Sequence, residues 1–445
     1  MQTLTIDSLD GTAEPIDISF DGRGGRMIGL GFINGVLKVL TLGLYSFWAK
    51  TEVRRRIWSA TRFNGEPLSY TGTGKELLLG FLIVFGAVLV PVMLTGVAAM
   101  MLFGKQAASI YQAVLYLLFF LVVGNAMYRA QRYRLSRTEW RGIRGSLIGS
   151  PGHYGWTYFW TLAGPFAAIA AFAGIAAYAT GPSVGGAIMF LGLIAVFWVL
   201  PWRSNRLQGM MTNDMRFGDR PLTYTGSARP LYKRYVVAWL GSCLILAAAL
   251  ASTGAYLMQD DRYVQWFVIK ETKPELADIA ILGVIWLTAL IASAVVTSWY
   301  RAMQMNHFAA HTHFEGATFR GEAKGRSLMW LVLSNWLLAI LGLIAAFAIG
   351  VALMYASGLT PKPNTGVSPA NPASIANLAP ALFLFPSIII MNTLTTTFAQ
   401  FRSARYFLSR LKLDGPIHLG AILQSQHTGP KRGEGLAQAF DLDAF

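Results

Sequence analysis

The sequence predicts an all-α polytopic membrane protein with about four transmembrane helical hairpins, a re-entrant or spanning first segment, and small repeated cytoplasmic β-hairpins. Three observations indicate this fold class. Of the 445 residues, 54% are hydrophobic and only 13% are charged, whereas about a quarter of a soluble domain is charged. Runs without an ionised side chain, such as 156–201, 235–258 and 279–299, are long enough to span a bilayer as helices. Arginine-rich segments with related sequences recur between pairs of these runs.

The chain begins with an N-terminal cytoplasmic β segment (1–26), followed by a first apolar segment (27–49). The first part is acidic and lacks a basic stretch before an apolar core, so it does not have the pattern of a cleavable secretory signal. The second part contains Lys38 and several glycines. Two interpretations stay open for it, namely a re-entrant helical hairpin and a ninth span.

Four apolar helical hairpins then alternate with five polar modules. The hairpins are expected at 77–127, 156–202, 235–299 and 328–400, and the modules at 50–76, 128–155, 203–234, 300–327 and 401–423, before a disordered tail at 424–445. Because each hairpin returns to the side from which it started, all modules share one side of the membrane. They hold most of the 37 lysines and arginines, so they and the C-terminus are expected in the cytoplasm.

Each module opens with basic residues at the end of a helix. Tryptophans lie nearby in sequence, which is typical of anchoring at a membrane interface. We expect these arginines to contact anionic lipid headgroups, since each basic residue near the surface contributes about 1 kcal/mol. A binding site for a substrate phosphate or an acidic partner is the alternative, whereas no groove-reading module indicates nucleic acid. The residues are Arg54, Arg55, Arg56, Arg129, Arg132, Arg203, Arg206, Arg301, Arg402 and Arg405.

Glycines mark the expected turns of the β-hairpins. The phrase PLSYTGT at 67–73 returns as PLTYTGS at 221–227, and an apolar residue precedes a glycine by one or two positions in every module. Two β-rich runs around Asn-Gly, as in TRFNGEPLSYTG, are a hairpin signature, and glycine accepts the positive φ that such turns require. The structural turn glycines are therefore predicted to be Gly22, Gly65, Gly72, Gly142, Gly218, Gly226, Gly316 and Gly415.

The segments FDGRGG, LTLGLYSFWAKTEVRRRIWSATRFNG and YTGTGKELLLG closely resemble the YjgN-like family of bacterial inner-membrane proteins, a domain of unknown function. The resemblance is densest over 20–80. It implies a multi-pass protein of the bacterial inner membrane and implies no reaction. The fourth module departs from the pattern, because histidines replace its basic residues.

The histidines of the fourth module are the weak candidates for a metal site. His307 and His311 would share one helix face, with His313 close by. No cysteine or HExxH pattern accompanies them. The TGTGKEL segment at 71–77 lacks the spacing of a phosphate-binding loop. Without paired carboxylates or a nucleophile with its base, we expect neither an enzyme nor a cofactor.

Two classes of function remain. The individual spans are expected at 77–103, 107–127, 156–180, 184–202, 235–258, 279–299, 328–356 and 376–400. Apart from Lys38 in the first segment, the apolar segments contain no Asp, Glu, Lys, Arg or His, which argues against an ion-coupled pump. The polar candidates that remain in these spans are Asn125, Asn335, Asn377 and Asn392. The first class is a transporter, channel or lipid-handling protein with a cavity lined by these asparagines and bounded by arginines at its cytoplasmic mouth. The alternative is a non-catalytic scaffold whose C-terminal tail recruits a cytoplasmic protein. Anionic phospholipids are expected partners, and the oligomeric state stays open.

Overall fold

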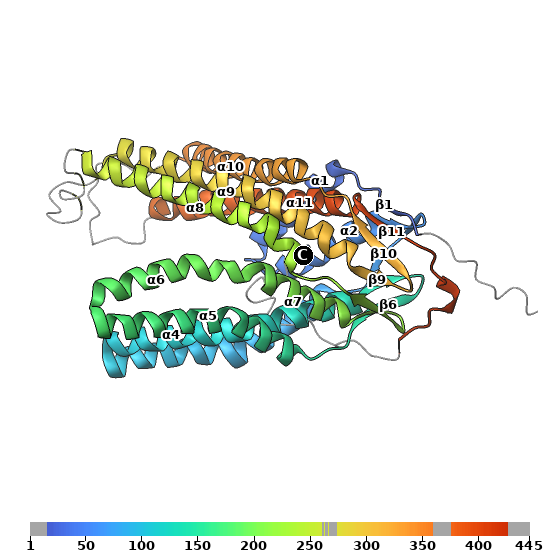
Figure 1. Ribbon diagram of the computed structural model, residues 1–445. Helices are drawn as coiled ribbons and strands as arrows, with labels where there is room; N and C mark the ends of the chain where they lie inside the picture. Colours follow the sequence, from blue (N-terminus) through green and yellow to red (C-terminus); the bar gives the residue numbers. More distant parts are fainter. Residues whose placement is uncertain (1–15, 260–261, 263–265, 267–273, 359–374, 426–445) are drawn as a thin grey trace, which may run out of the picture.

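The computed structural model describes residues 16–259, 262, 266, 274–358 and 375–425. Within them, long helices form one end of the molecule and short strands the other (Figure 1). Most of the predicted N-terminal segment (1–26) lies outside the described residues. The same holds for most of the predicted tail (424–445), which was expected to recruit a cytoplasmic protein. The mostly helical architecture agrees with a polytopic membrane protein.

Seven helices of the described residues are long and apolar enough to cross a membrane. The seven stretches are built from the helical elements α3 (Gly74–Val84), η2 (Phe85–Leu89), α4 (Val90–Ser136), α5 (Pro151–Thr180), α6 (Pro182–Val196), η3 (Phe197–Val199), α7 (Leu200–Asn213), α8 (Arg229–Met258), α9 (Leu276–Ala310), α10 (Gly325–Ala356) and α11 (Ile375–Leu408).

The first of these helices reverses direction at Gly104, where φ is 79° and ψ is −175°. The Tyr111 hydroxyl donates to the Val92 carbonyl at 2.7 Å, although nineteen residues of a straight helix would separate them by roughly 28 Å. The stretch from Gly74 to Ser136 therefore consists of two antiparallel pieces.

The helices also continue past the apolar runs. The predicted spans end at 127, 202, 299 and 400, whereas α4, the α6–α7 stretch, α9 and α11 continue for about two to three further turns. The arginine-rich modules thus begin as helix. Their polar residues ended the apolar pattern without ending the helical backbone.

The strands form two antiparallel sheets, and their described members follow one another around an apolar interior. A three-stranded sheet has the order β1-β2-β3 and an eight-stranded sheet the order β11-β10-β9-β8-β7-β6-β5-β4. Only Leu68 separates β3 from β4, and β1 also contacts β11. The strands are β1 (Ile18–Phe20), β2 (Thr61–Phe63), β3 (Glu66–Pro67), β4 (Ser69–Tyr70), β5 (Thr138–Trp140), β6 (Ile143–Leu147), β7 (Met215–Phe217), β8 (Arg220–Tyr224), β9 (Thr312–Phe314), β10 (Ala317–Gly321) and β11 (Leu411–Asp414).

Two-residue turns join four of the strand pairs. Three turns have positive φ at both positions, as a type I′ turn requires: Asn64-Gly65, Arg141-Gly142 and Glu315-Gly316. The fourth, Gly218-Asp219, has positive φ at its glycine, and Gly415 has positive φ after β11. That these turns lie in the cytoplasm stays a prediction.

The other three predicted turn glycines have a different role. Gly22, Gly72 and Gly226 do not adopt positive φ. Each packs against the aromatic ring two positions earlier, so a Cβ on Gly72 would lie 2.7 Å from the Tyr70 ring and one on Gly226 2.2 Å from the Tyr224 hydroxyl. Close approach of the ring, rather than backbone conformation, explains the glycine of the YTG phrase.

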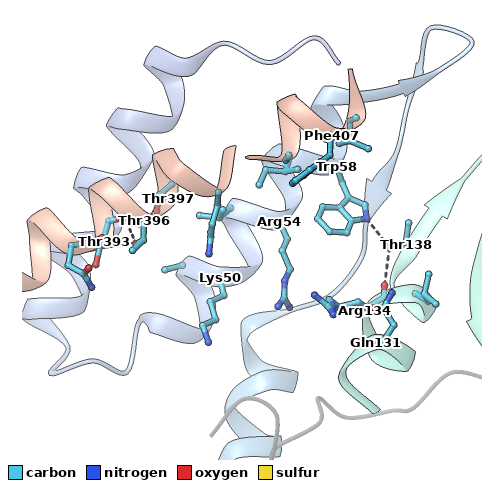
Figure 2. Close-up of a pocket in the computed structure, with 18 of the residues that line it drawn as sticks. Lys50, Arg54, Trp58, Gln131, Arg134, Thr138, Thr393, Thr396, Thr397 and Phe407 are labelled. Carbon is cyan, nitrogen blue, oxygen red and sulfur yellow. Dashed lines mark hydrogen bonds between the residues drawn. The ribbon is translucent and has the colours of Figure 1, made fainter. Parts of the chain in front are cut away.

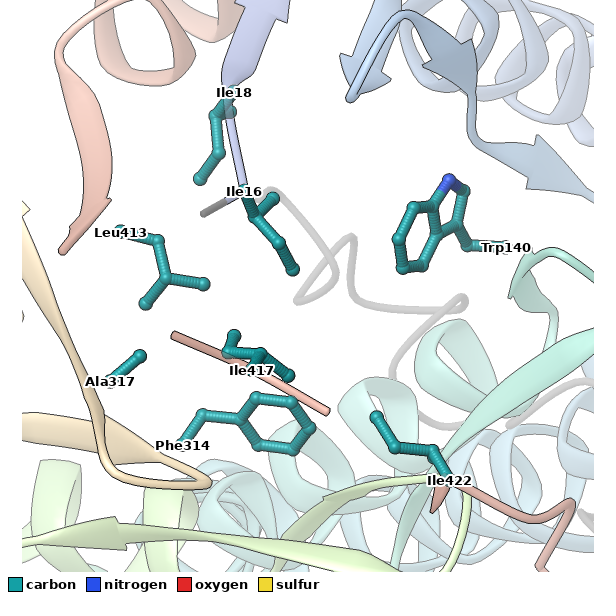
Figure 3. Packing of buried hydrophobic residues seen from close by; sticks show 8 residues of the cluster. All are labelled: Ile16, Ile18, Trp140, Phe314, Ala317, Leu413, Ile417 and Ile422. Carbon is teal, nitrogen blue, oxygen red and sulfur yellow. The ribbon is translucent and has the colours of Figure 1, made fainter. Parts of the chain in front are cut away.

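The interior of the sheets is closed by the segment that follows β11. Ile417 is fully buried at its centre, among Ile16, Phe314 and Leu413 (Figure 3). The Asp219 amide donates to the Leu423 carbonyl at 2.9 Å, and the Leu423 amide donates to the Asp219 carboxylate at 3.0 Å. Residues 415–423 therefore seal the apolar core against water.

The predicted first segment, 27–49, consists of two helices rather than one. α1 (Gly24–Leu40) and α2 (Ser46–Ala60) are separated by a turn in which Leu42 and Gly43 have positive φ. β1 precedes α1, β2 follows α2, and these strands pair with Ile18 opposite Phe63. The segment therefore starts and ends at the same sheet, as re-entry requires.

Helix contacts divide into two groups (Figure 1). α4, α5 and α6 pack in succession, and so do α8, α9, α10, α11 and α1. Near the sheet, α7 contacts α5 and α8, while α2 contacts α1, α3 and α11. The two groups are thus linked at the strand end of the molecule.

Candidate functional site

A cavity of about 500 Å³ lies between α2, the last turns of α4 and α11 (Figure 2). On α11 its lining extends from Asn392 to Leu408, a distance of roughly 24 Å along the helix axis. It therefore reaches from the strand end of the molecule deep along α11.

One wall of the cavity is a polar stripe on α11. Its residues occupy positions i, i+1, i+4, i+5 and i+8, which places them on one face of the helix. The Thr393 hydroxyl donates to the Ile389 carbonyl at 2.7 Å and accepts from the Lys38 ammonium at 3.4 Å. The stripe comprises Asn392, Thr393, Thr396, Thr397 and Gln400.

Four cationic side chains line the same cavity, and none of the lining residues that the structure describes is acidic. They are Lys38 of α1, Lys50 and Arg54 of α2, and Arg134 of α4. Arg134 donates to the Gln131 amide oxygen at 2.6 Å. Cations gathered in a concave, partly apolar wall concentrate the positive potential, so the cavity is suited to an anion.

A hydrogen bond between elements fixes the end of the cavity nearest the sheet. The Trp58 indole N–H on α2 donates to the Thr138 hydroxyl on β5 at 2.8 Å (Figure 2). The apolar ring of Phe407 on α11 lies close by. This bond connects α2 to β5, which follows α4, and so fixes two walls relative to each other.

The arginines predicted as lipid or anion contacts divide into two sets. The first set is partly buried and holds helices together. Arg132 donates to the Gly149 carbonyl, Arg203 donates to the Tyr158 carbonyl at 3.3 Å, and Arg402 donates to Asn335 at 2.9 Å. Together with Arg54 in the cavity, these side chains contact other parts of the protein, and their contact with lipid headgroups stays a prediction.

The second set is exposed. Arg55 also donates to the Gly72 carbonyl at 3.3 Å, so it supports the YTG turn. Contact of this set with lipid headgroups stays a prediction. Its members are Arg55, Arg56, Arg129, Arg206, Arg301 and Arg405.

Among the predicted polar residues of the spans, Asn392 and Lys38 line the cavity. Asn335 binds Arg402 instead, and Asn125 packs against Gly155 of α5. The side chain of Asn377 lies outside the described residues. Lys50, Arg134 and the α11 threonines were not predicted from the sequence as residues of this site. The sequence MNTLTTTFAQ (391–400) does have a polar residue at every fourth position, and this pattern could have indicated a polar face on α11.

The three histidines do not form a metal site. The rings of His307 and His311 are 4.2 Å apart. His313 lies on β9, where its ring nitrogens contact the Thr318 and Thr225 hydroxyls at 2.9 and 3.0 Å. No group of three or more histidine, cysteine or acidic residues in the described part of the chain could hold a metal ion. The described residues thus give no support to a metal site at this trio, in which β9 directs His313 into the sheet.

Carboxylates near the strands are used in ion pairs. Glu66 accepts two hydrogen bonds from Arg141, at 2.7 and 3.0 Å, and the pKa of Glu66 is lowered chiefly by the hydrogen bond from Arg141. Glu322 accepts from Lys412 at 2.9 Å across β10 and β11. These acids join neighbouring strands and do not line the cavity.

Comparison with known proteins places the chain in a family. It is 36% identical over 66 residues to the inner membrane protein YjgN of Salmonella typhimurium, an alignment that spans 15% of this chain and 17% of that protein. No solved structure matches. The model of a family described as bacterial protein of unknown function (DUF898) matches residues 15–439. The chain therefore belongs to this YjgN-like family, and its apolar helices agree with a place in the bacterial inner membrane.

Proposed function

We propose that this protein is a transporter or lipid-handling protein of the inner membrane that binds an anionic solute or headgroup in the cavity between α2, α4 and α11. The observation that carries the proposal is the lining itself. Four cations face a space of about 500 Å³ that has no carboxylate among its described lining residues and continues along the polar face of α11.

Electrostatics support an anion as the ligand. In partly buried surroundings with an effective dielectric constant near 20, a unit charge about 5 Å from a cation gains about 3 kcal/mol. Several cations around one cavity add to this gain, and the α11 hydroxyls and amides offer hydrogen bonds that help to replace the anion's water.

The position of the cavity supports movement of the ligand rather than static binding. It lies where the two helix groups meet, between α4 of one group and α11 of the other. One of its walls, α1–α2, starts and ends at the same sheet. In membrane proteins, irregular backbone and polar side chains at membrane depth are tolerated where they line a cavity.

Orientation and lipid contact belong to the same proposal. The strand end faces the cytoplasm, because the basic residues gather there, and the exposed arginines meet anionic headgroups. Arg206 is exposed whereas its neighbour Arg203 binds the Tyr158 carbonyl. Arg206→Gln should therefore lower co-purification of phosphatidylglycerol without loss of stability, and unchanged lipid content would contradict the headgroup contact.

The anion site is tested by binding to the purified protein. Inorganic phosphate, glycerol 3-phosphate and succinate are titrated as probes, and uptake of any binder is then followed in proteoliposomes. Arg54→Gln should lower the affinity of the binder ten- to hundredfold, because a hydrogen bond to a charged group contributes about 1.5–3 kcal/mol. Arg134→Gln should act in the same direction.

Arg56→Gln is the matched control, since Arg56 belongs to the same arginine run but is exposed and does not line the cavity. Its affinity should equal that of the unmodified protein. If Arg56→Gln and Arg54→Gln weaken binding equally, the effect is one of net charge and the cavity is not the site. If none of the probes binds, the anion proposal fails for these solute classes.

A further inference from the structure

A second cavity, of about 470 Å³, lies between the start of α8 and the last turns of α9. It is lined by Arg229, Lys233 and Arg234 of α8 and by Tyr300 and His307 of α9, together with apolar atoms. It shares no lining residue with the cavity at α11. Its lining within the described part of the chain contains no carboxylate either.

The N-terminus of α8 adds positive potential to this cavity. The N-cap residue is Ala228, which forms no side-chain cap, and the first turn contains no acidic residue. Pro230 has no amide hydrogen and the Leu231 amide donates to the Ala228 carbonyl at 3.1 Å, so this end offers few free amides. The helix dipole is nevertheless positive here and favours an anion.

Tyr300 is the independent sign of a ligand. The residue is only 8% exposed and its ring packs edge-on against Tyr235 with centroids 5.1 Å apart. Its hydroxyl is buried and has no hydrogen-bond partner among the described residues. Since a buried hydroxyl without a partner costs free energy, a ligand that bonds to it would be stabilised.

The other polar groups of the cavity are a histidine and three basic side chains. The His307 Nε2 lies 2.9 Å from the Ser227 carbonyl oxygen, so this nitrogen carries the proton and points at the loop before α8. Arg234 contacts the Met303 sulfur at 2.9 Å, a weak acceptor. Arg229 and Lys233 are exposed side chains at the rim.

An apolar stripe continues from the cavity along α8. Lys233 is followed on the same helix face by Val237, Leu240 and Leu244, which are 56%, 49% and 70% exposed in the isolated chain. A free phosphate would use the cations only. A phospholipid would use both parts, with its phosphate at the cations and its acyl chains against the stripe.

We propose that this cavity binds the phosphate of an anionic phospholipid, whose acyl chains lie along Val237, Leu240 and Leu244. The site rests on the part of the proposed function that places the strand end at the membrane surface. It does not rest on the anion cavity at α11.

The test is native mass spectrometry of the purified full chain titrated with phosphatidylglycerol or phosphatidylethanolamine. The unmodified protein should retain phosphatidylglycerol in preference to the zwitterionic lipid. Lys233→Gln should reduce that preference about tenfold, as expected for the loss of one charge-assisted hydrogen bond. Tyr300→Phe, which keeps the ring, should reduce it several-fold.

One control makes the result specific. Lys105→Gln removes an exposed cation at the Gly104 reversal of α4, remote from the strands, and should leave the preference unchanged. Equal retention of phosphatidylglycerol by the unmodified protein and Lys233→Gln would overturn the proposal, and so would an equal loss in Lys105→Gln.

The source of the phosphate is tested by competition. Inorganic phosphate and water-soluble glycerophosphoglycerol should displace phosphatidylglycerol poorly, because they lack acyl chains. Complete displacement by either would show a soluble phosphate site and would overturn the lipid assignment. If the unmodified protein prefers phosphatidylglycerol but binds none of the solute probes, the proposed anion site between α2, α4 and α11 is refuted and the lipid site at α8 is not.

Discussion

Replacing Gly35 by alanine should separate α1 from α11 and disturb the anion cavity. A Cβ on Gly35 would lie 2.8 Å from the Ile390 Cα and 3.0 Å from the Ile390 carbonyl oxygen, both backbone atoms, whereas ordinary contact begins at 3.4 Å. The helices must therefore separate locally by about 0.6 Å, because backbone cannot rotate away as a side chain can. Overpacking of this kind costs about 1–3 kcal/mol.

Gly29→Ala provides the matched control. Gly29 lies on the same helix, but nothing approaches its Cβ position within 4 Å. Alanine there should stabilise the helix by about 0.5–1 kcal/mol, because it removes the conformational freedom of glycine. The two alanine variants should thus differ in free energy of unfolding by about 1.5–4 kcal/mol.

The assay is unfolding of the purified protein in detergent micelles by added SDS, followed by far-ultraviolet circular dichroism. Anion binding is the second readout, since Lys38 follows Gly35 by one turn and contacts Thr393 at 3.4 Å. Gly35→Ala should lower both stability and anion affinity. Equal stability of Gly35→Ala and Gly29→Ala would refute the close packing of α1 on α11.

Three further predictions concern other parts of the molecule. Asn34→Leu should stabilise the protein by about 1–3 kcal/mol in SDS unfolding. The reason is that Asn34 is fully buried and that neither the nitrogen nor the oxygen of its side-chain amide has a hydrogen-bond partner among the described residues. A loss of stability would contradict this. The pKa of Glu322 is lowered chiefly by the hydrogen bond from the lysine on β11, so its contribution to stability exists above its unfolded pKa of about 4.3 and is lost as pH falls through the lower folded pKa. The stability gap between the unmodified protein and Glu322→Gln should be present at neutral pH and vanish at acid pH; a gap that persists there would exclude the ion pair as its cause. After replacement of Cys243, cysteines introduced at Asn64 and Asp219 should react with an impermeant maleimide only in inverted vesicles, whereas labelling of one of them in intact cells would refute the common orientation.

Local chemistry made several elements predictable. The Asn64-Gly65 pair occupies a turn with positive φ at both residues, because these residues tolerate that conformation. The long uncharged runs correspond to apolar helices. The role of Gly72 was not predictable in the same way. A glycine after a tyrosine and a threonine can form a turn or can make room for the tyrosine ring, and the local sequence does not distinguish the two roles.

The cavity depends on contacts that sequence spacing does not specify. Lys38, Arg54, Arg134 and Asn392 come from four helices, and no local pattern shows that they meet. The arginine pairs illustrate the same limit. Arg129 is exposed while Arg132 is partly buried, yet in the next pair Arg203 is partly buried while Arg206 is exposed. Which arginine of a pair faces inward is decided by the neighbouring helix.

The arrangement of the strands restricts how the anion cavity can open. β6 pairs with β7 and thereby joins the chain that follows α4 to the chain that follows α7. β4 pairs with β5, and β10 pairs with β11, which follows α11. The ends of α4 and α11 are thus tied to one hydrogen-bonded assembly of strands. Since sheets of this kind do not stretch without breaking hydrogen bonds, the two helix groups can separate more easily at the ends remote from the strands. A ligand that reaches Lys38 and Asn392 would therefore open the cavity away from the sheet, with the strands as the pivot.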